Sequence, residues 1–287
     1  MDEQRVNSVK IAAGIVLHNP DLQRLAENIK SVYSQVEILV LVDNNSFNIE
    51  IINNIYDRYP KISIIRNNQN LGIATALNQI IEYCIKLGYE WVLTLDQDSV
   101  CPDNLISEYL KWIDAEKMAI LSPTIIDRNK IDKHFSQTKQ SDLEIVDKCI
   151  TSGSLINAGV WSKIGKFDEV MFIDEVDFEY CQRVIDCGFL IYRANNTKLL
   201  HEIGKITIHR FLFWNVTVKN HNSFRKYFMA RNVLYVAFKQ HSFFVILKAY
   251  LRVFKILIVT ILYENDKINK AKSIIKGCRD SRLIRRE

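Results

Sequence analysis

Two aspartates, Asp96 and Asp98, stand one residue apart in the short sequence LDQDS (95–99). Two like charges this close repel each other unless a cation lies between them. A hard divalent ion such as Mg²⁺ or Mn²⁺ is commonly held by one or two carboxylates together with water and substrate phosphates. The pair therefore predicts a metal–diphosphate site, provided that the fold presents both side chains at a ligand-binding edge.

The residues before this pair, WVLTLD (91–96), form a short apolar run that is typical of a buried strand. Similar runs occur at VKIAAGIVL (9–17), EILVLVD (37–43) and KISIIR (61–66). Stretches of helical period separate them. One places Leu22, Leu25, Ile29 and Val32 on one face, and another places Leu77, Ile80, Ile81, Cys84 and Ile85 together before a capping Gly88. This alternation predicts an α/β fold with an open, mostly parallel sheet covered by helices on both faces.

Three of the predicted strands end in polar groups. These are His18-Asn19-Pro20, Asp43-Asn44-Asn45-Ser46 and Asp96-Gln97-Asp98-Ser99. Ligands of open α/β sheets bind outside the carboxyl ends of the strands, so we expect these groups at the binding edge. The alternative is that Asp43 and Asp98 start turns or cap helices, which aspartates also do.

Composition narrows the class of protein. The chain has 287 residues, of which 48% are hydrophobic and 25% charged, values that are ordinary for a globular protein. The six cysteines include no CxxC pair, and the N-terminus lacks an apolar signal core. We therefore expect reduced thiols in a cytoplasmic protein of one large domain, or of one domain with an appendage.

The C-terminal segment has a different character. Residues 239–287 contain 12 Lys and Arg against 4 Asp and Glu, whereas the remainder contains 26 against 29. Residues 242–263 are apolar, but Lys248, Arg252 and Lys255 interrupt them and share one helical stripe with His241. This pattern predicts an interfacial helix on an anionic membrane surface, at the inner face of the cell membrane. The alternatives are a helix packed on the catalytic domain or in a homodimer interface; no nucleic-acid-binding module accompanies the basic residues.

Seven motifs occur in a recognisable order. They are VDNNS (42–46), NQNLGIATALNQI (68–80), LDQDS (95–99), SGSLI (152–156), FDEVMFIDEVDFEYCQR (167–183), HEIGK (201–205) and RKYFMARN (225–232). Over residues 9–235 the chain resembles family 2 glycosyltransferases of the GT-A fold, and within them the bacterial rhamnosyltransferases. The resemblance implies a GT-A catalytic domain over residues 1–238 and a basic, amphipathic helical region over residues 239–287.

The resemblance also implies which residues bind the nucleotide-sugar and the metal ion. Leu17, His18 and Asn19 match the wall of the nucleotide pocket, and Asp43 with Asn44 matches the group that binds the pyrimidine. Asn70, Gly72 and Asn78 match the loop and helix start that close over the nucleoside. Asp96, Gln97 and Asp98 match the D-x-D motif, and His201 matches a histidine that completes the Mg²⁺ or Mn²⁺ site. Arg225, Arg231 and Asn232 are expected to clamp the diphosphate, for which guanidinium groups are suited.

Inverting sugar transfer needs a carboxylate that takes the proton of the acceptor hydroxyl. The family usually supplies it from a Glu-Asp pair about six residues before an arginine, and Arg183 places Asp177 at that position. Val176 stands where the glutamate is expected, so Asp174 is the alternative base. A third interpretation is that the acids around Asp177, among them Glu175 and Glu179, form the N-terminal turn of a helix, where negative charge is favoured.

The predicted function is an inverting, metal-dependent rhamnosyltransferase. Its donor would be deoxythymidine-diphosphate-L-rhamnose and its acceptor a lipid-linked saccharide of bacterial cell-surface polysaccharide, such as O-antigen. One alternative is a family 2 transferase with a UDP-hexose donor. Another is a non-catalytic subunit that binds a sugar nucleotide.

Overall fold

The computed structural model describes residues 9–128, 141–202, 207–211 and 214–284. The chain divides into two compact units. The first takes in the residues up to Asp168 and Tyr180–Glu202, and the second takes in Glu169–Glu179 and the residues from Ile203 onward.

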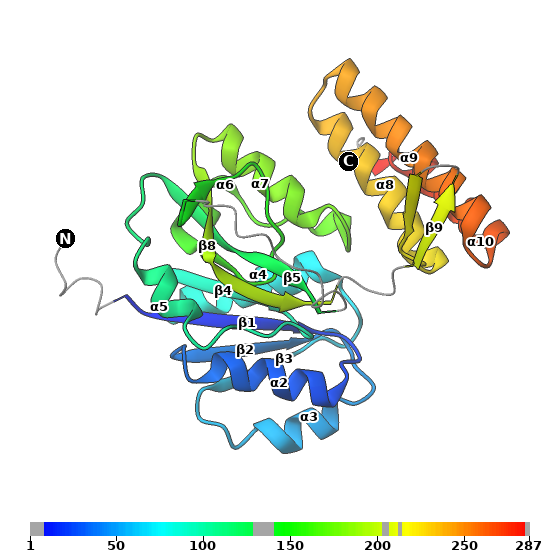
Figure 1. The fold of residues 1–287 in the computed structure, drawn as a ribbon. Helices are drawn as coiled ribbons and strands as arrows, with labels where there is room; N and C mark the ends of the chain where they lie inside the picture. Colours follow the sequence, from blue (N-terminus) through cyan, green and yellow to red (C-terminus); the bar gives the residue numbers. More distant parts are fainter. Residues whose placement is uncertain (1–8, 129–140, 203–206, 212–213, 285–287) are drawn as a thin grey trace. The chain divides into compact units, whose positions relative to one another are not determined.

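The first unit contains a large mixed sheet (Figure 1). Among the described residues, eight strands have the order β3-β2-β1-β4-β7-β5-β8-β6. The strands are β1 (Ile11–Leu17), β2 (Ile38–Asp43), β3 (Ile62–Arg66), β4 (Trp91–Asp96), β5 (Met118–Asp127), β6 (Leu143–Ile145), β7 (Ser154–Asn157) and β8 (Leu190–His201). Strands β1 to β4 are parallel to one another, so the four strands predicted from apolar runs are confirmed. Strand β7 is antiparallel to both β4 and β5, β5 and β8 are parallel, and β6 is antiparallel to β8.

Helices cover both faces of this sheet. They are α2 (Leu22–Tyr33), α3 (Ile49–Tyr56), α4 (Ile73–Lys86), α5 (Leu105–Leu110), α6 (Ala158–Ile164) and α7 (Val176–Asp186). Helices α2, α3 and α5 share one core with alternate strand residues such as Ile15 and Leu41, and Figure 1 shows α2 and α3 on that side of the sheet. Helix α4 lies against β1 on the opposite face, where a side chain at Gly14 would overlap Ile80.

The predicted end of α4 at Gly88 is confirmed. Gly88 has a φ of +83°, its N–H donates to the Ile85 carbonyl at 2.9 Å, and the Tyr89 N–H donates to the Cys84 carbonyl at 3.0 Å. This pair of bonds satisfies the last helical carbonyls and requires a left-handed residue, for which glycine is preferred. Helix α2, expected from its apolar face, begins after Asp21, whose carboxylate accepts a hydrogen bond from the Arg24 N–H at 3.0 Å.

The described part of the second unit contains helices and a pair of antiparallel strands. They are α8 (Ser223–Lys239), α9 (Phe243–Tyr263), α10 (Lys267–Asp280), β9 (Thr207–Phe211) and β10 (Trp214–Val218), preceded by the short 3₁₀ helix η2 (Glu169–Met171). The helices share a core, to which α8 contributes Ala230, Val233, Leu234, Ala237 and Phe238, α9 contributes Ala249 and Val253, and α10 contributes Ile274. Gly277 lets α10 approach α8 closely, because a side chain there would overlap the Tyr227 carbonyl.

The predicted boundary after residue 238 does not coincide with the division into compact units. That boundary follows α8, whereas α8 shares its core with α9 and α10. A buried ion-pair network joins the same elements: Glu264, 1% exposed, accepts from Lys226 at 2.5 Å and from Lys270 at 2.8 Å. Helix α8, which lies before the predicted boundary, therefore belongs with the C-terminal helices. None of the helices in the described parts of the chain is both long enough and apolar enough to cross a membrane.

Candidate active site

The loops that follow β1, β2 and β4 are tied together by hydrogen bonds. The His18 backbone N–H donates to Gln97 Oε1 at 2.8 Å, and His18 Nδ1 lies 3.0 Å from the Asn44 carbonyl oxygen. The Asn19 N–H donates to Ser46 Oγ at 2.8 Å. The structure therefore brings the three predicted polar strand ends together at one edge of the sheet.

Asp43 and Asn44 are buried at the end of β2. Both carboxylate oxygens of Asp43 accept from the Ser46 N–H, at 3.2 and 3.1 Å, so Asp43 starts a turn, as the alternative interpretation proposed. Asn44 Nδ2 donates to the Gly72 carbonyl at 3.0 Å and ties β2 to the start of α4. Contact of these two residues with a pyrimidine stays a prediction.

The predicted nucleoside loop has a defined conformation. Asn70 Oδ1 accepts from the Gly72 N–H at 2.9 Å, and Gly72, with a φ of +86°, is the residue before α4. Asn78 lies in α4 and is buried. It is 1% exposed, donates to the Phe167 carbonyl at 2.9 Å and accepts from the Phe167 N–H at 2.9 Å. Its amide joins α4 to the backbone of Phe167, and contact of Asn78 with a nucleoside stays a prediction.

Asp96, Asp98 and His201 lie together at the carboxyl ends of β4 and β8. A bridge between Val100 and Leu200 brings the loop after β4 alongside the last residues of β8. His201 Nε2 is 3.9 Å from Asp96 Oδ2, and His201 Nδ1 is 3.5 Å from Asp98 Oδ1. Ser99 Oγ lies 3.1 Å from the same Nδ1, which fixes the orientation of the ring.

The charge around His201 favours its protonated form. Burial by itself would lower the pKa of His201, but contact with Asp98 and the charges of Asp96, Asp98 and Asp127 outweigh it, and the pKa is raised. Asp127 was not predicted from the sequence. It ends β5 directly beside His201 in the parallel register with β8, and the signal that could have found it is the apolar run ILSPTIID ending in a carboxylate.

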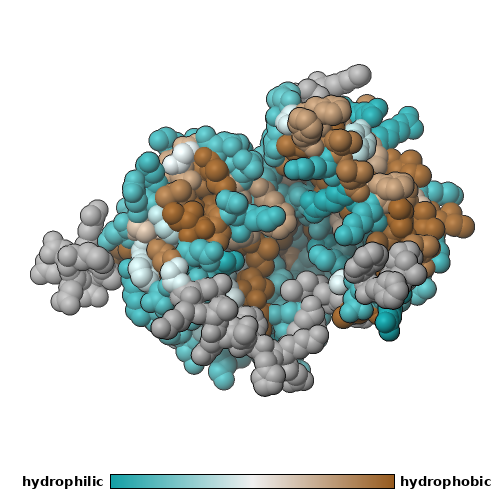
Figure 2. Space-filling view, turned by 45° about the horizontal axis from the view of Figure 1, so that its top comes forward, coloured by the Kyte–Doolittle hydropathy of each residue, from teal (hydrophilic) through white to brown (hydrophobic). Residues whose placement is uncertain are grey.

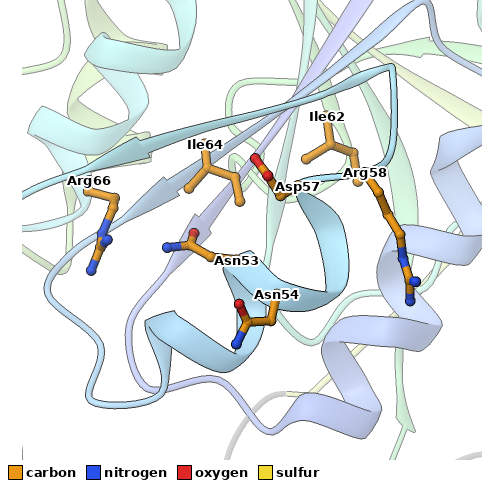
Figure 3. Close-up of a pocket in the computed structure, with 7 residues that line it drawn as sticks. All are labelled: Asn53, Asn54, Asp57, Arg58, Ile62, Ile64 and Arg66. Carbon is orange, nitrogen blue, oxygen red and sulfur yellow. The ribbon is translucent and has the colours of Figure 1, made fainter.

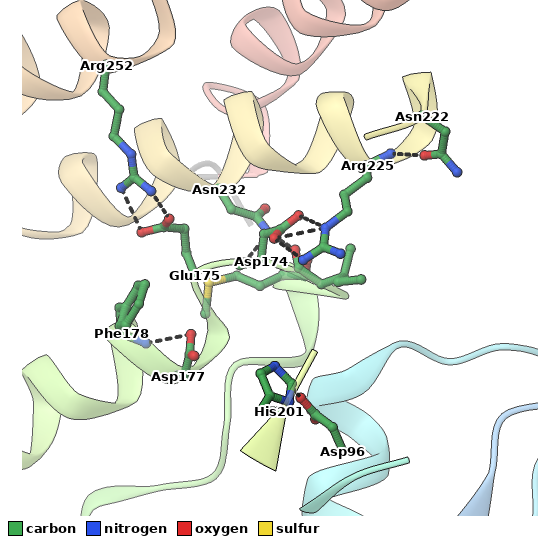
Figure 4. Close-up of polar contacts among 12 residues, drawn as sticks. Asp96, Asp174, Glu175, Asp177, Phe178, His201, Asn222, Arg225, Asn232 and Arg252 are labelled. Carbon is green, nitrogen blue, oxygen red and sulfur yellow. Dashed lines mark hydrogen bonds and ion pairs between the residues drawn. The ribbon is translucent and has the colours of Figure 1, made fainter. Parts of the chain in front are cut away.

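The remaining predicted residues lie in the second unit, in and around the turn before α7. Asp174 forms an ion pair with Arg225, and the Asp177 carboxylate accepts from the Phe178 N–H at 3.0 Å (Figure 4). Arg231 and Asn232 of α8 also donate hydrogen bonds to the backbone of this segment. The buried Asn232 amide donates to the Met171, Ile173 and Asp174 carbonyls, at 2.7, 2.7 and 2.9 Å.

Comparison with known proteins identifies the family. The model of glycosyl transferase family 2 matches residues 13–183, which include the strand ends, the D-x-D pair and the start of α7. The chain belongs to glycosyl transferase family 2. It is 30% identical over 244 residues to the dTDP-rhamnosyl transferase RfbF of Shigella flexneri, covering 80% of this chain and 81% of that protein.

Solved structures of other glycosyltransferases share the fold of this family 2 chain. A fragment of TarS from S. aureus, solved with UDP-GlcNAc, matches with a TM-score of 0.60 and 13% identity, over 95% of this chain and 80% of that one. GalNAc-T7 with UDP, GalNAc and Mn²⁺ matches with a TM-score of 0.57 and 14% identity, over 78% of this chain and half of that one. Identities this low establish the shared α/β architecture of the GT-A type and nothing more specific.

The residues of this family 2 chain fit a divalent metal ion in their chemistry. Asp98 Oδ1 is buried and has no hydrogen-bond partner among the described residues, as expected of an oxygen that a cation would occupy. Two ligands about 2.1 Å from one ion are at most about 4.2 Å apart, and the separations of 3.5 and 3.9 Å to His201 lie within that limit. Within the described residues, no group of three or more His, Cys, Asp or Glu side chains has the geometry of a metal centre.

A surface cavity of the transferase lies elsewhere in the first unit (Figure 3). It is lined by residues of α3, the following turn and β3, namely Asn53, Asn54, Asp57, Arg58, Ile62, Ile64 and Arg66. It contains none of the predicted site residues, and its Arg66 forms an ion pair with Glu50 at 2.6 Å. This cavity takes no part in the proposed chemistry.

Proposed function

We propose that the protein is an inverting, metal-dependent rhamnosyltransferase that uses deoxythymidine-diphosphate-L-rhamnose. The observation that carries the donor assignment is the 30% identity to a dTDP-rhamnosyl transferase over about four fifths of both chains. The polar strand ends in the first unit support a site for the nucleotide, and the acidic end of β4 supports a site for the diphosphate and its metal.

In this proposal Asp96, Asp98 and His201 hold Mg²⁺ or Mn²⁺. The ion would supply charge stabilisation to the departing diphosphate. Asp177 takes the proton of the acceptor hydroxyl. Asp174 is the weaker candidate, because its carboxylate accepts three hydrogen bonds from Arg225, at 3.0, 3.1 and 3.2 Å, which it would have to give up on protonation.

We further propose that α9 binds the inner face of the cell membrane, where a lipid-linked saccharide acceptor would be found. Its exposed apolar residues follow one helical stripe: Phe243, Leu247, Leu251, Phe254, Ile258 and Ile261, with Phe244 and Leu262 at its border. Brown, apolar surface accordingly interrupts the teal on the helical unit in Figure 2. Exposed Lys248 and Lys255 flank this stripe, an arrangement that suits an anionic lipid surface.

A donor screen tests the activity. The purified protein is incubated with deoxythymidine-diphosphate-rhamnose, UDP-glucose, UDP-galactose or UDP-GlcNAc, each with Mn²⁺ and with EDTA, and nucleotide release is measured. We expect release from the deoxythymidine donor only, and only with metal. Release from a UDP donor would replace the donor assignment, and release from none would support a subunit that binds a sugar nucleotide without turnover.

A further inference from the structure

The turn before α7 has an unusual backbone. Phe172, Asp174 and Glu175 have φ values of +59°, +66° and +65°, in the left-handed region that residues other than glycine rarely adopt. Such a conformation persists only where the surrounding structure holds it, and it tends to occur at functional sites. The contacts that hold this turn therefore indicate what it is for.

Side chains of α8 hold the backbone of the turn. Asn232, 0% exposed, donates its amide hydrogens to three carbonyls of the turn region, those of Met171, Ile173 and Asp174, at 2.7–2.9 Å. Arg231 donates to the Val170 carbonyl and to Asn232 Oδ1, so it fixes the amide as well as the turn. The Phe172 ring stacks on Phe228 of the same helix, with centroids 5.0 Å apart. The turn carbonyls that form no hydrogen bonds within a helix or sheet are thus bonded by side chains of α8.

Two ion pairs hold the side chains of the turn. Arg225 of α8 donates hydrogen bonds from Nε and Nη2 to the Asp174 carboxylate. Arg252 of α9 donates two to the Glu175 carboxylate, at 2.5 and 3.2 Å (Figure 4). A fork-shaped guanidinium fixes both the distance and the direction of a carboxylate, which a lysine does not. Arg225 lies in the first turn of α8, where its N–H is capped by Asn222 Oδ1 at 2.9 Å. The cap therefore also fixes the backbone position from which the Arg225 side chain extends.

We infer that Arg225 and Asn232 are positioning residues for the base Asp177, which stands two residues after the turn in the first turn of α7; this inference rests on the proposed function. The turn sets where α7 begins, and the start of α7 sets the direction of the Asp177 carboxylate. The sequence predicted that Arg225, Arg231 and Asn232 clamp the donor diphosphate. Their contacts instead assign them to the turn, because their donor groups are directed at Asp174 and at backbone carbonyls.

Exchanging the partners of the Asp174–Arg225 pair tests this role. We expect Asp174→Arg and Arg225→Asp each to lower kcat by about 100-fold, because misplacement of a reacting group by about 1 Å costs that much. The affinity for deoxythymidine diphosphate should stay within twofold of wild type. The double exchange should recover at least tenfold over either single variant. A double variant as inactive as Asp174→Arg would indicate that Asp174 itself is the base. Weakened nucleotide binding in Arg225→Asp would indicate that Arg225 binds the donor diphosphate. Either result overturns the inference.

Hydrogen exchange gives a readout that does not depend on turnover. In Asn232→Ala and Arg225→Gln, the amides of residues 172–178 should exchange at least tenfold faster, while those of α10 should not change. Arg279→Gln, at an exposed arginine of α10, is the matched control. Unchanged exchange in the turn would contradict the inference. A different result is that wild type releases nucleotide from no donor while the variants still show the expected faster exchange. The proposed function would then be wrong, but Arg225 and Asn232 would still be shown to stabilise the turn.

Discussion

The acidic residues around the start of α7 differ in what they contact. Asp174, Glu175 and Glu179 form ion pairs with Arg225, Arg252 and Lys239. A carboxylate locked into an ion pair stabilises structure, but it loses that pairing when it takes up a proton. Asp177 accepts a hydrogen bond from the Phe178 N–H, in the first turn of a helix where negative charge is favoured. The sequence left Asp174 and Asp177 as alternatives because the arginine that distinguishes them lies about 50 residues further along the chain.

Asp177→Asn should lower kcat by about 10²–10⁴-fold, the usual contribution of a general base. Binding of nucleotide and Mn²⁺ should not change, and calorimetric titration measures both. Asp186→Asn, on the same helix, is the control. Loss of nucleotide affinity in Asp177→Asn would mean that Asp177 binds the donor rather than acting as the base.

Asp98→Asn should lower the affinity for Mn²⁺ by at least about 10-fold, because it removes charge from a proposed metal ligand whose Oδ1 has no hydrogen-bond partner among the described residues. Electron paramagnetic resonance of free Mn²⁺ during a titration measures this. The melting temperature should change little, since the side chain stands at a strand end rather than in the core. Asp103→Asn, at an exposed position shortly after the same loop, is the control. Equal Mn²⁺ affinity in the two variants would remove Asp98 from the metal site.

His221 predicts a pH dependence of stability. Burial, followed by the charge of Arg225, lowers the pKa of His221 from 6.5 to about 4, and Asp174 offsets this only in part. Between these two values the unfolded chain binds a proton that the folded chain does not. The free energy of unfolding should therefore be highest above pH 6.5 and should fall as the pH drops toward 4. Urea unfolding of wild type and His221→Gln at pH 7.5, 6 and 5 checks this; equal slopes in the two proteins would exclude His221 as the cause.

At the scale of elements, periodicity predicted what local sequence determines. Strands β1 to β4 were predicted from apolar runs, helix α2 from its apolar face and the end of α4 from Gly88, and each is confirmed. Strands β5 and β8 were not predicted, and their pairing joins segments about 70 residues apart, which no local pattern specifies. The contact of the Asn78 amide with the Phe167 backbone could not be predicted for a related reason, because the two residues lie 89 positions apart in the chain.

Helix α9 shows the same division between local pattern and tertiary packing. Its length and its exposed apolar stripe agree with the sequence, and Phe243 and Phe244 are 73% and 72% exposed. Its opposite face, with Ala249 and Val253, packs in the helical core. Deleting the helix would therefore expose the core of α8, and point substitutions on the outer face are the better test of membrane binding.

Phe243→Ser combined with Phe244→Ser should weaken binding to vesicles of anionic lipid by at least about 10-fold, since burying one Phe side chain is worth about 1.5–3 kcal/mol. Cosedimentation measures this, with Phe47→Ser, an exposed phenylalanine of the first unit, as the control. Lys248→Glu with Lys255→Glu should weaken binding at low salt and have less effect at high salt. Arg252 is left intact because it holds Glu175. Vesicle binding that survives both sets of changes would place the membrane contact elsewhere.

At the scale of the whole molecule, the chain combines a sheet unit with a helical unit, and the predicted residues are divided between them. The first unit carries the strand ends, the D-x-D pair and His201. The second carries Asp177, the strained turn and the helices that hold it. The sequence predicted a catalytic domain that ends at residue 238. It could not show that residues 169–179 belong with the C-terminal helices, because contacts with α8, rather than chain order, determine this.

The central claim is inverting transfer of rhamnose from a deoxythymidine donor, and the anomeric form of the first product tests it most directly. Deoxythymidine-diphosphate-β-L-rhamnose is incubated with the protein and Mn²⁺, with water or a membrane lipid extract as acceptor, and ¹H NMR spectra are recorded before mutarotation. A single displacement predicts deoxythymidine diphosphate together with an α-L-rhamnosyl product, and neither when EDTA replaces the metal. A product that keeps the β configuration, or a donor that stays intact while a UDP-sugar is consumed under the same conditions, would contradict the account.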